Sequence, residues 1–392
     1  MILRLERWGA WVKLADPAAI VALDRDAVRA LGVDGGRAWD GPARPGGPSR
    51  PVEVHLAVTA RCGAGCTGCY LDARPDGLEP PFEALVTALD AMRDAGVFTV
   101  AFGGGEPTTR DDLDALADAA RARGLTPVLT TSGLGLSSAR AERLRAFAQV
   151  NVSYDGPDGA YASVRGFDGA AAAEAAIARL SAAGVRVGVN VVLTRASFPR
   201  LRETMARARA LGAVEAQLLR YKPAGRAASL DYLAQRLTSA QACSLGPTLR
   251  ALTDAFCQSG DFHVRIDCAL VPFLSADPDL AGDPARLSRW GVFGCEAAAA
   301  LSAVTAEGRV APCSFGPASA ARPADLARGC RDDAELRRWR RPAGASAEPC
   351  ASCSLALVCK GGCKVVASFV SGALGPDPEC PRVVARRGGG AA

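Results

Sequence analysis

The sequence has few of the residues that most often mark a metal, membrane or nucleic-acid site. Only two of its 392 residues are histidines, so a metal site would depend mainly on sulfur. No apolar run is long enough to cross a bilayer, and charges interrupt the first eight residues where a signal peptide needs an apolar core. Arginine supplies nearly all of the positive charge, and the net charge of +5 is modest for this length. We therefore expect no membrane and no nucleic-acid partner.

Cysteine, by contrast, is plentiful, with 14 copies. Because no export signal is recognisable, these cysteines favour metal binding in a reducing compartment over disulfide bonds. We therefore expect a cytoplasmic protein. Apolar residues make up 49% of the chain and charged residues 22%, which is typical of a globular enzyme.

Strand-like and helical patterns alternate along most of the chain. Six apolar runs are typical of buried strands, at residues 52–58, 97–102, 127–130, 150–153, 185–193 and 214–219. Repeated strand–helix units predict a parallel sheet that is closed or half closed into a barrel. We expect an α/β protein with a partial (β/α)6 TIM-like barrel over 52–262, followed by a cysteine-rich, loop-rich domain over 263–385.

The patterns outside the barrel are shorter. Residues 1–51 predict a strand or hairpin over 3–14, a helical stretch over 17–31 and a Gly/Pro-rich linker over 32–51. A helix is expected over roughly 239–259 and a strand over 263–266. The last residues, 386–392, are expected to form a disordered tail.

Polar and cysteine motifs follow the predicted strands at the point where each strand ends. The first strand is followed by Cys62-Gly-Ala-Gly-Cys66-Thr-Gly-Cys69, and the second by Gly-Gly-Gly-Glu over 103–106. Ser153 ends the fourth strand and Asn190 lies near the end of the fifth. In a βα barrel these loops open on one face, where such folds carry their sites. The sequence therefore predicts a single site at the carboxyl ends of the strands.

Two cysteine patterns indicate iron–sulfur chemistry. Three thiolates on one loop, Cys62, Cys66 and Cys69, can hold three corners of a cubic cluster and leave the fourth iron open to a ligand. The second pattern lies near the C-terminus and has enough sulfur for closed clusters; its cysteines are Cys295, Cys313, Cys350, Cys353, Cys359, Cys363 and Cys380.

The first cysteine loop and the Gly-Gly-Glu-Pro motif resemble those of radical S-adenosylmethionine (SAM) enzymes. The later cysteines resemble the SPASM extension of the members that modify peptides and proteins. The resemblance covers residues 52–385. It implies a [4Fe–4S] cluster whose open iron binds SAM, and electron transfer into SAM that releases a 5′-deoxyadenosyl radical.

The resemblance also implies residues that contact SAM. The glycines Gly103, Gly104 and Gly105 would let the backbone approach the methionyl end, and Glu106 would accept from its ammonium. Ser153, Arg165 and Asn190 would hold its carboxylate or ribose. Relatives often carry an aromatic residue before the third cysteine; here that residue is Gly68, so we expect Tyr70 or another side chain to contact the adenine.

The same resemblance divides the later cysteines between two auxiliary [4Fe–4S] clusters, for three clusters in all. One would be held by Cys350, Cys353, Cys359 and Cys380. The other would be held by Cys295, Cys313 and Cys363, with Cys268 as the expected fourth ligand.

Simpler interpretations exist for several of these features. The closely spaced cysteines over 350–363 also suit a zinc ribbon, which would make the extension a structural module. Asp155 and Asp267 are candidates for a catalytic acid or base, but turn capping explains either one equally well.

The expected function is modification of a peptide or protein, by a crosslink or an oxidation that begins with hydrogen abstraction. A radical SAM enzyme for a small molecule, such as a tetrapyrrole or sugar, is the first alternative, and a non-catalytic iron–sulfur or zinc protein is the second. A leader peptide would be recognised by a separate protein or at a strand edge near 3–14. A flavodoxin or ferredoxin is the expected electron donor.

Overall fold

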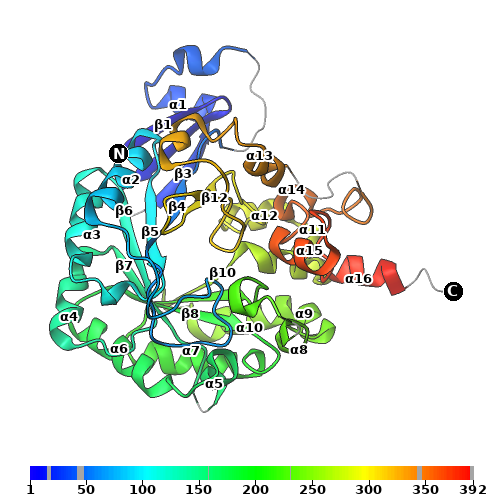
Figure 1. Ribbon diagram of the computed structural model, residues 1–392. Coiled ribbons are helices and arrows are strands. Elements are labelled where there is room, and N and C mark those ends of the chain that lie inside the picture. Colours follow the sequence, from blue (N-terminus) through cyan, green and yellow to red (C-terminus); the bar gives the residue numbers. More distant parts are fainter. Residues whose placement is uncertain (16–18, 42–47, 158, 230, 342–346, 389–392) are drawn as a thin grey trace.

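A nine-stranded, mostly parallel sheet forms the centre of the computed structural model, which describes residues 1–15, 19–41, 48–157, 159–229, 231–341 and 347–388 (Figure 1). Its strand order is β10-β9-β8-β7-β6-β5-β4-β11-β12. The six expected barrel strands are all present and parallel: β4 (Glu53–Thr59), β5 (Thr99–Gly104), β6 (Thr126–Thr131), β7 (Gln149–Ser153), β8 (Val187–Leu193) and β9 (Glu215–Arg220). The prediction of a partial α/β barrel is confirmed.

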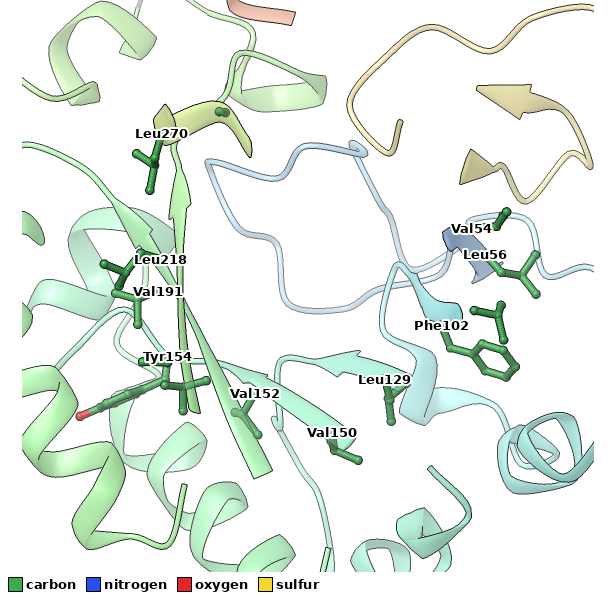
Figure 2. Close-up of a cluster of buried hydrophobic side chains, with 14 of the residues drawn as sticks. Val54, Leu56, Phe102, Leu129, Val150, Val152, Tyr154, Val191, Leu218 and Leu270 are labelled. Carbon is green, nitrogen blue, oxygen red and sulfur yellow. The ribbon is translucent and has the colours of Figure 1, made fainter. Parts of the chain in front are cut away.

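Helices follow the barrel strands and cover the outside of the sheet (Figure 1). They are α2 (Phe82–Asp94), α3 (Leu113–Ala122), α4 (Ser138–Arg143), α5 (Ala160–Arg165), α6 (Ala170–Ala182), α7 (Leu201–Ala210), α8 (Asp231–Gln235), α9 (Ser239–Cys243) and α10 (Leu245–Phe256). Alternate side chains of the strands point at these helices, as Val54, Phe102 and Leu129 do in Figure 2. The helix expected over 239–259 is two helices, α9 and α10, which meet at Ser244.

The C-terminal region completes the sheet at both of its edges. Strand β10 (His263–Ile266) adds to β9, while β11 (Leu301–Val304) adds in parallel to β4 and pairs with the short β12 (Val310–Ala311). The hydrophobic core is continuous across residue 263 and includes Leu218 of the barrel and Leu270 beyond it (Figure 2). The proposed division at 262/263 therefore separates two parts of one packed unit.

The region expected to be rich in loops also contains short helices. They are α11 (Pro278–Gly282), α12 (Pro284–Arg289), α13 (Ala334–Arg340), α14 (Ala356–Cys359), α15 (Lys364–Ser371) and α16 (Pro381–Gly388). The last helix includes residues 386–388, which the sequence analysis assigned to the tail; residues 389–392 lie outside the described part of the chain. Among the described residues, no helix is both long and apolar enough to cross a membrane.

A separate three-stranded antiparallel sheet forms the N-terminal region: β1 (Ile2–Glu6), β2 (Gly9–Leu14) and β3 (Ala19–Asp24). The hairpin expected over 3–14 is confirmed. The helix expected over 17–31 is wrong for residues 19–24, because Ile20 and Val21 favour a strand and this segment pairs with β2. The helix α1 (Arg25–Ala30) begins only after Asp24, whose carboxylate caps it; residues 17 and 18 lie outside the described residues.

The N-terminal sheet lies against the amino ends of the barrel strands. The Arg4 guanidinium donates to Pro51 O at 2.6 Å and to Gly96 O at 2.9 Å, and Lys13 donates to Gly124 O at 3.0 Å. These acceptors immediately precede β4, β5 and β6. The sheet is therefore at the opposite end of the barrel from the loops that carry the cysteine and glycine motifs.

Candidate active site

The first cysteine loop is held by backbone hydrogen bonds at the carboxyl end of the barrel. Cys62 N donates to Arg74 O at 2.8 Å, and Thr67 N donates to Arg165 O at 3.0 Å. Cys69 O accepts from Arg226 N, in the loop after β9, at 2.8 Å. All three cysteines are half-buried. The loop is therefore fixed to the segment around Arg74, to α5 and to the β9 loop, at the mouth of the barrel.

The glycine run after β5 clamps this loop by close backbone contact. A Cβ at Gly104 would lie 2.1 Å from Thr59 O, and one at Gly105 would lie 2.1 Å from Arg61 O. Only glycine fits at these two positions, since both contacts are with backbone. Nothing lies within 4 Å of a Cβ at Gly103. Of the three glycines expected to face SAM, Gly103 is therefore the one with open space in front of it.

The buried Glu106 carboxylate ties the loop after β5 to the loop after β6. Oε1 accepts from Thr108 N and Oγ1 and from Thr131 Oγ1, and Oε2 accepts from Ser132 N and Oγ. These bonds range from 2.5 to 3.1 Å. The carboxylate therefore already has several protein donors and positions both loops.

Asp155 is buried and holds Arg165 in place. Its Oδ2 accepts from Arg165 Nε at 2.6 Å, and its Oδ1 accepts from Val192 N at 2.7 Å. The Arg165 guanidinium lies beside the Cys66 thiol, where it opposes the burial that raises the pKa of that thiol. Both Asp155 oxygens are thus engaged, which gives this acid/base candidate a positioning role.

Asn190 presents an unpartnered acceptor at the same end of the sheet. It is 8% exposed and pairs in register with Ser153 on β7. Its Nδ2 lies 3.5 Å from Thr130 Oγ1, but its Oδ1 is buried without a hydrogen-bond partner. A buried unpaired oxygen is costly unless a ligand donates to it. This fits a donor-bearing ligand such as SAM at the carboxyl ends of β7 and β8.

Tyr70 packs against an aromatic residue of the C-terminal region. Its ring packs on Phe315 of the C-terminal region, with centroids 4.6 Å apart, and burial raises its pKa to about 12. The space beside Gly68 is filled instead by Tyr221, whose Cε2 would lie 3.2 Å from a Cβ at that position. Tyr221 also lines a cavity of about 240 Å³ together with Thr67, Val164 and Thr194. The sequence offered no sign that Tyr221 fills this space.

The later cysteines lie in two groups. In the first, Cys268 interacts electrostatically with Cys295 and Cys363, and Cys313 interacts with Cys295. Burial raises the pKa of Cys313 to about 11 and that of Cys363 to about 12. The second group consists of the four cysteines that line one cavity, Cys350, Cys353, Cys359 and Cys380.

Buried cations and carboxylates surround the first group. Lys222 forms an ion pair with Asp267 and lies with its Nζ 4.3 Å from the centre of the Phe315 ring. Asp267 also accepts from Ala269 N at 2.8 Å. This second acid/base candidate is thus engaged by a lysine and by a helix N-terminus.

Asp377 lies between the two groups. It accepts from Cys363 N at 2.9 Å and forms a bidentate ion pair with Arg220 at 2.6 and 3.0 Å. Sequence analysis missed this pair because its partners are 157 residues apart. The one available sign was an arginine at the end of a strand with an apolar pattern.

Within the described ranges, no three Cys, His, Asp or Glu side chains gather as ligands of a single ion. The sulfurs that hold a cubic cluster bind different iron atoms, so a cluster does not require that arrangement. A half-buried three-cysteine loop beside an unpartnered Asn190 oxygen, at the mouth of a partial barrel, fits an enzyme that binds a ligand to an open iron.

Comparison with known proteins identifies the class. The Radical SAM superfamily model matches residues 56–207. The chain is 30% identical over 353 residues to mycofactocin maturase MftC of Mycolicibacterium smegmatis, which covers 85% of this chain and 83% of that protein. It is 28% identical over 345 residues to the PqqA peptide cyclase of Rhodopseudomonas palustris, with coverage of 84% and 86%.

The fold is shared with SuiB of Streptococcus suis, solved with its precursor peptide SuiA, at a TM-score of 0.72 and 18% identity over 97% of this chain and 98% of that one. The protein belongs to the radical SAM family. Membership brings one [4Fe–4S] cluster and SAM as cofactors, and makes the chain an enzyme.

Proposed function

We propose that this enzyme modifies a peptide or protein by abstracting a hydrogen atom from it. Bound together at the barrel mouth, the cluster and SAM supply a 5′-deoxyadenosyl radical. The observation that carries the proposal is similarity along nearly the whole chain to a maturase and a peptide cyclase. The shared fold with SuiB, solved with a precursor peptide, agrees with it.

In this proposal Cys62, Cys66 and Cys69 hold the SAM-binding cluster. Their fixed loop and half-buried sulfurs support the assignment. Asn190 Oδ1 would accept a hydrogen bond from SAM, with Ser153 opposite it on the neighbouring strand. Arg165 would stabilise the anionic sulfur of Cys66, and Glu106 would keep the surrounding loops in place.

We further propose two auxiliary [4Fe–4S] clusters, one for each group of four later cysteines. The cavity lined by Cys350, Cys353, Cys359 and Cys380 supports one of them. The mutual interactions among Cys268, Cys295, Cys313 and Cys363 support the other. Lys222 would offset negative charge on the first group, the one that contains Cys268 and Cys363, since a cation beside thiolates stabilises them.

A substrate leader would bind either a separate protein or the N-terminal sheet. Strand β2 is central in that sheet, so the free edges belong to β1 and β3 rather than to the whole segment 3–14. An extended peptide on either edge would lie at the amino end of the barrel. It would need a spacer of about six residues or more to pass along a strand to the mouth, at ~3.3 Å per residue.

The test is an anaerobic iron and sulfide count followed by incubation with reductant and SAM. About twelve irons, or three cubic clusters of four, and release of 5′-deoxyadenosine are expected. When a short Cys- or Gly-rich peptide encoded beside the gene is included in this incubation, mass spectrometry should show a change in the mass of the peptide. SAM cleavage with no peptide modified, but with a tetrapyrrole or sugar consumed, would favour the small-molecule alternative. Zinc with roughly four irons would make the extension a structural module.

A further inference from the structure

An apolar patch lies on the surface beside the second cysteine group. Leu357 is 90% exposed and lies in α14, between Cys353 and Cys359. Trp290 is 58% exposed and Phe293 is 43% exposed, both just after α12. We call these three residues, Trp290, Phe293 and Leu357, the α14 patch. Three large apolar side chains exposed on two contacting segments are unusual on a surface that meets only water.

Two members of the α14 patch, Phe293 and Leu357, lie next to one backbone junction. Gly294 N donates to Val358 O at 2.8 Å, and a Cβ at Gly294 would lie 2.0 Å from Cys359 O. The segment that carries Phe293 therefore lies directly on the turn that carries Leu357. The same turn supplies Cys359 to the cavity shared by four cysteines.

The C-terminal part of the chain, which carries the patch, is basic in composition, and four of its arginines lie close to the patch or to the cavity of the second cysteine group. Residues 284–392 hold 15 Arg and Lys against 9 Asp and Glu, an excess of six, whereas residues 1–283 hold 31 against 32. Arg382 lines the same cavity as the four cysteines, and Arg386 and Arg387 are exposed one turn further along α16. Arg286 lies over the Trp290 ring, 4.3 Å from its centre. Figure 1 shows α14 and α16 on the same side of the molecule, away from the N-terminal sheet.

We propose that the α14 patch and the arginines of α16 form the docking surface for an acidic one-electron carrier protein. The inference rests on the proposed function, because it needs a cluster held by Cys350, Cys353, Cys359 and Cys380. In each encounter the carrier loses one electron and the cluster gains it; no bond or proton is exchanged. A small apolar centre within a charged rim suits the brief, salt-sensitive complexes of electron transfer.

Two other occupants fit less well. A second copy of this chain would bring one basic surface against another, which is unfavourable. The substrate peptide has to reach the barrel mouth, where the Cys62 loop lies, whereas the patch lies beside the turn that carries Cys359.

The experiment follows reduction of the oxidised holoenzyme by a reduced plant-type [2Fe–2S] ferredoxin of net negative charge. The two test variants are Leu357→Ser and the double variant Arg386→Glu/Arg387→Glu. The matched control is Arg7→Glu/Arg29→Glu, on exposed arginines of the N-terminal region. Stopped-flow absorbance gives the bimolecular rate, and calorimetry with oxidised ferredoxin gives its Kd.

At low salt, the Arg386/Arg387 double variant should be reduced about tenfold more slowly and should lose most of its salt dependence. Leu357→Ser should raise the Kd for ferredoxin and leave the salt dependence of the reduction rate nearly unchanged. Dithionite, a small reductant, should reduce all variants at the wild-type rate. Equal rates with ferredoxin in test and control variants would overturn the docking surface. Size-exclusion chromatography tests the alternative occupant: a wild-type dimer that only the test variants lose would assign the patch to a second copy of the chain.

Failure of the proposed function gives a different result. If reconstituted protein binds only about four irons, the auxiliary cluster is absent before any carrier is added, and the docking surface is excluded with it. If all clusters are present but the variants behave as wild type, only the docking surface is excluded.

Discussion

The cysteine loop at the barrel mouth and the cysteines of the C-terminal region differ in the number of sulfurs in each set and in the open space beside them. The loop offers three half-buried sulfurs held by backbone hydrogen bonds, beside open space at Gly103 and an unpartnered oxygen at Asn190. The later cysteines form two groups of four; Cys295, Cys363 and Cys380 are buried and the other five are half-buried. An incomplete set beside open space suits ligand binding, whereas complete sets of four suit electron storage or transfer.

Each region also has its own cation. Arg165 lies beside Cys66 at the mouth and is held by Asp155, while Lys222 lies beside Cys363 and is held by Asp267. The two aspartates considered as acid or base are therefore the groups that hold these cations. Because the two regions have separate cysteines and separate cations, we expect that replacing a cysteine in one region leaves the other region functional.

The largest expected effect separates the two sets of cysteines. Cys66→Ala should abolish release of 5′-deoxyadenosine, because the cluster that binds SAM is lost. Cys353→Ala should remove about four irons per chain but keep SAM cleavage in the absence of substrate. Iron analysis and chromatography of the nucleoside products measure both. If the two variants lose SAM cleavage equally, the regions do not act separately.

A strong effect on stability is expected where the two regions meet. Arg220 is 4% exposed and forms ion pairs with Asp377 and Glu379. Arg220→Met would leave the buried Asp377 carboxylate without its ion-pair partner, which costs about 3–5 kcal/mol, whereas Glu379 would keep its ion pair with Arg236. We expect a melting temperature several degrees lower, measured by circular dichroism of the holoprotein.

The matched control for Arg220→Met is Arg328→Met. Arg328 pairs with Asp325 at 2.7 Å, but its side chain is 70% exposed. The loss should be below about 1 kcal/mol, since water and salt screen an exposed pair. Similar shifts in the two variants would contradict a structural role for the Arg220–Asp377 pair.

A smaller effect is expected from Glu106→Gln. The amide has nearly the same shape, but its NH2 group would face donors that now bond to the carboxylate of Glu106. We expect a loss of about 1–3 kcal/mol in stability and weaker SAM binding, because the loops after β5 and β6 lose their shared acceptor. Equilibrium binding of SAM measures the second effect. Glu83→Gln, in the first turn of α2, is the control and should change neither quantity.

The barrel was predictable because its six strands are apolar runs, each bounded by polar or glycine residues, and that signal is local. Residues 19–24 were harder, since Ala and Leu suit either a helix or a strand and pairing with β2 decides between them. The site was predictable only in part. Spacing reveals the C-x3-C-x2-C loop, but the partners of Asp155 and Asp267 are set by tertiary contacts with Arg165 and Lys222.

The contact between Tyr70 and Phe315 shows the same limit. The two rings are 245 positions apart in the sequence and meet only because β11 pairs with β4 and brings the C-terminal loops to the barrel mouth. The space beside Gly68 could then be filled by Tyr221 from the β9 loop. Neither arrangement leaves a local pattern in the sequence, so the sequence of the cysteine loop alone predicts neither contact.

The smallest expected effect concerns Asn190, at the site with open space at the barrel mouth. Asn190→Ala removes a buried oxygen that has no protein partner, so stability should change by less than about 1 kcal/mol. If SAM donates to that oxygen, affinity for SAM should fall up to about tenfold, the equivalent of one hydrogen bond. Asn151→Ala is the control on the adjacent strand, since the Asn151 oxygen already accepts from Gln149 at 2.8 Å. That variant should lose stability and keep its affinity for SAM. An Asn190→Ala protein that binds SAM as tightly as the wild type would remove Asn190 from the SAM site and leave its unpaired oxygen to another ligand.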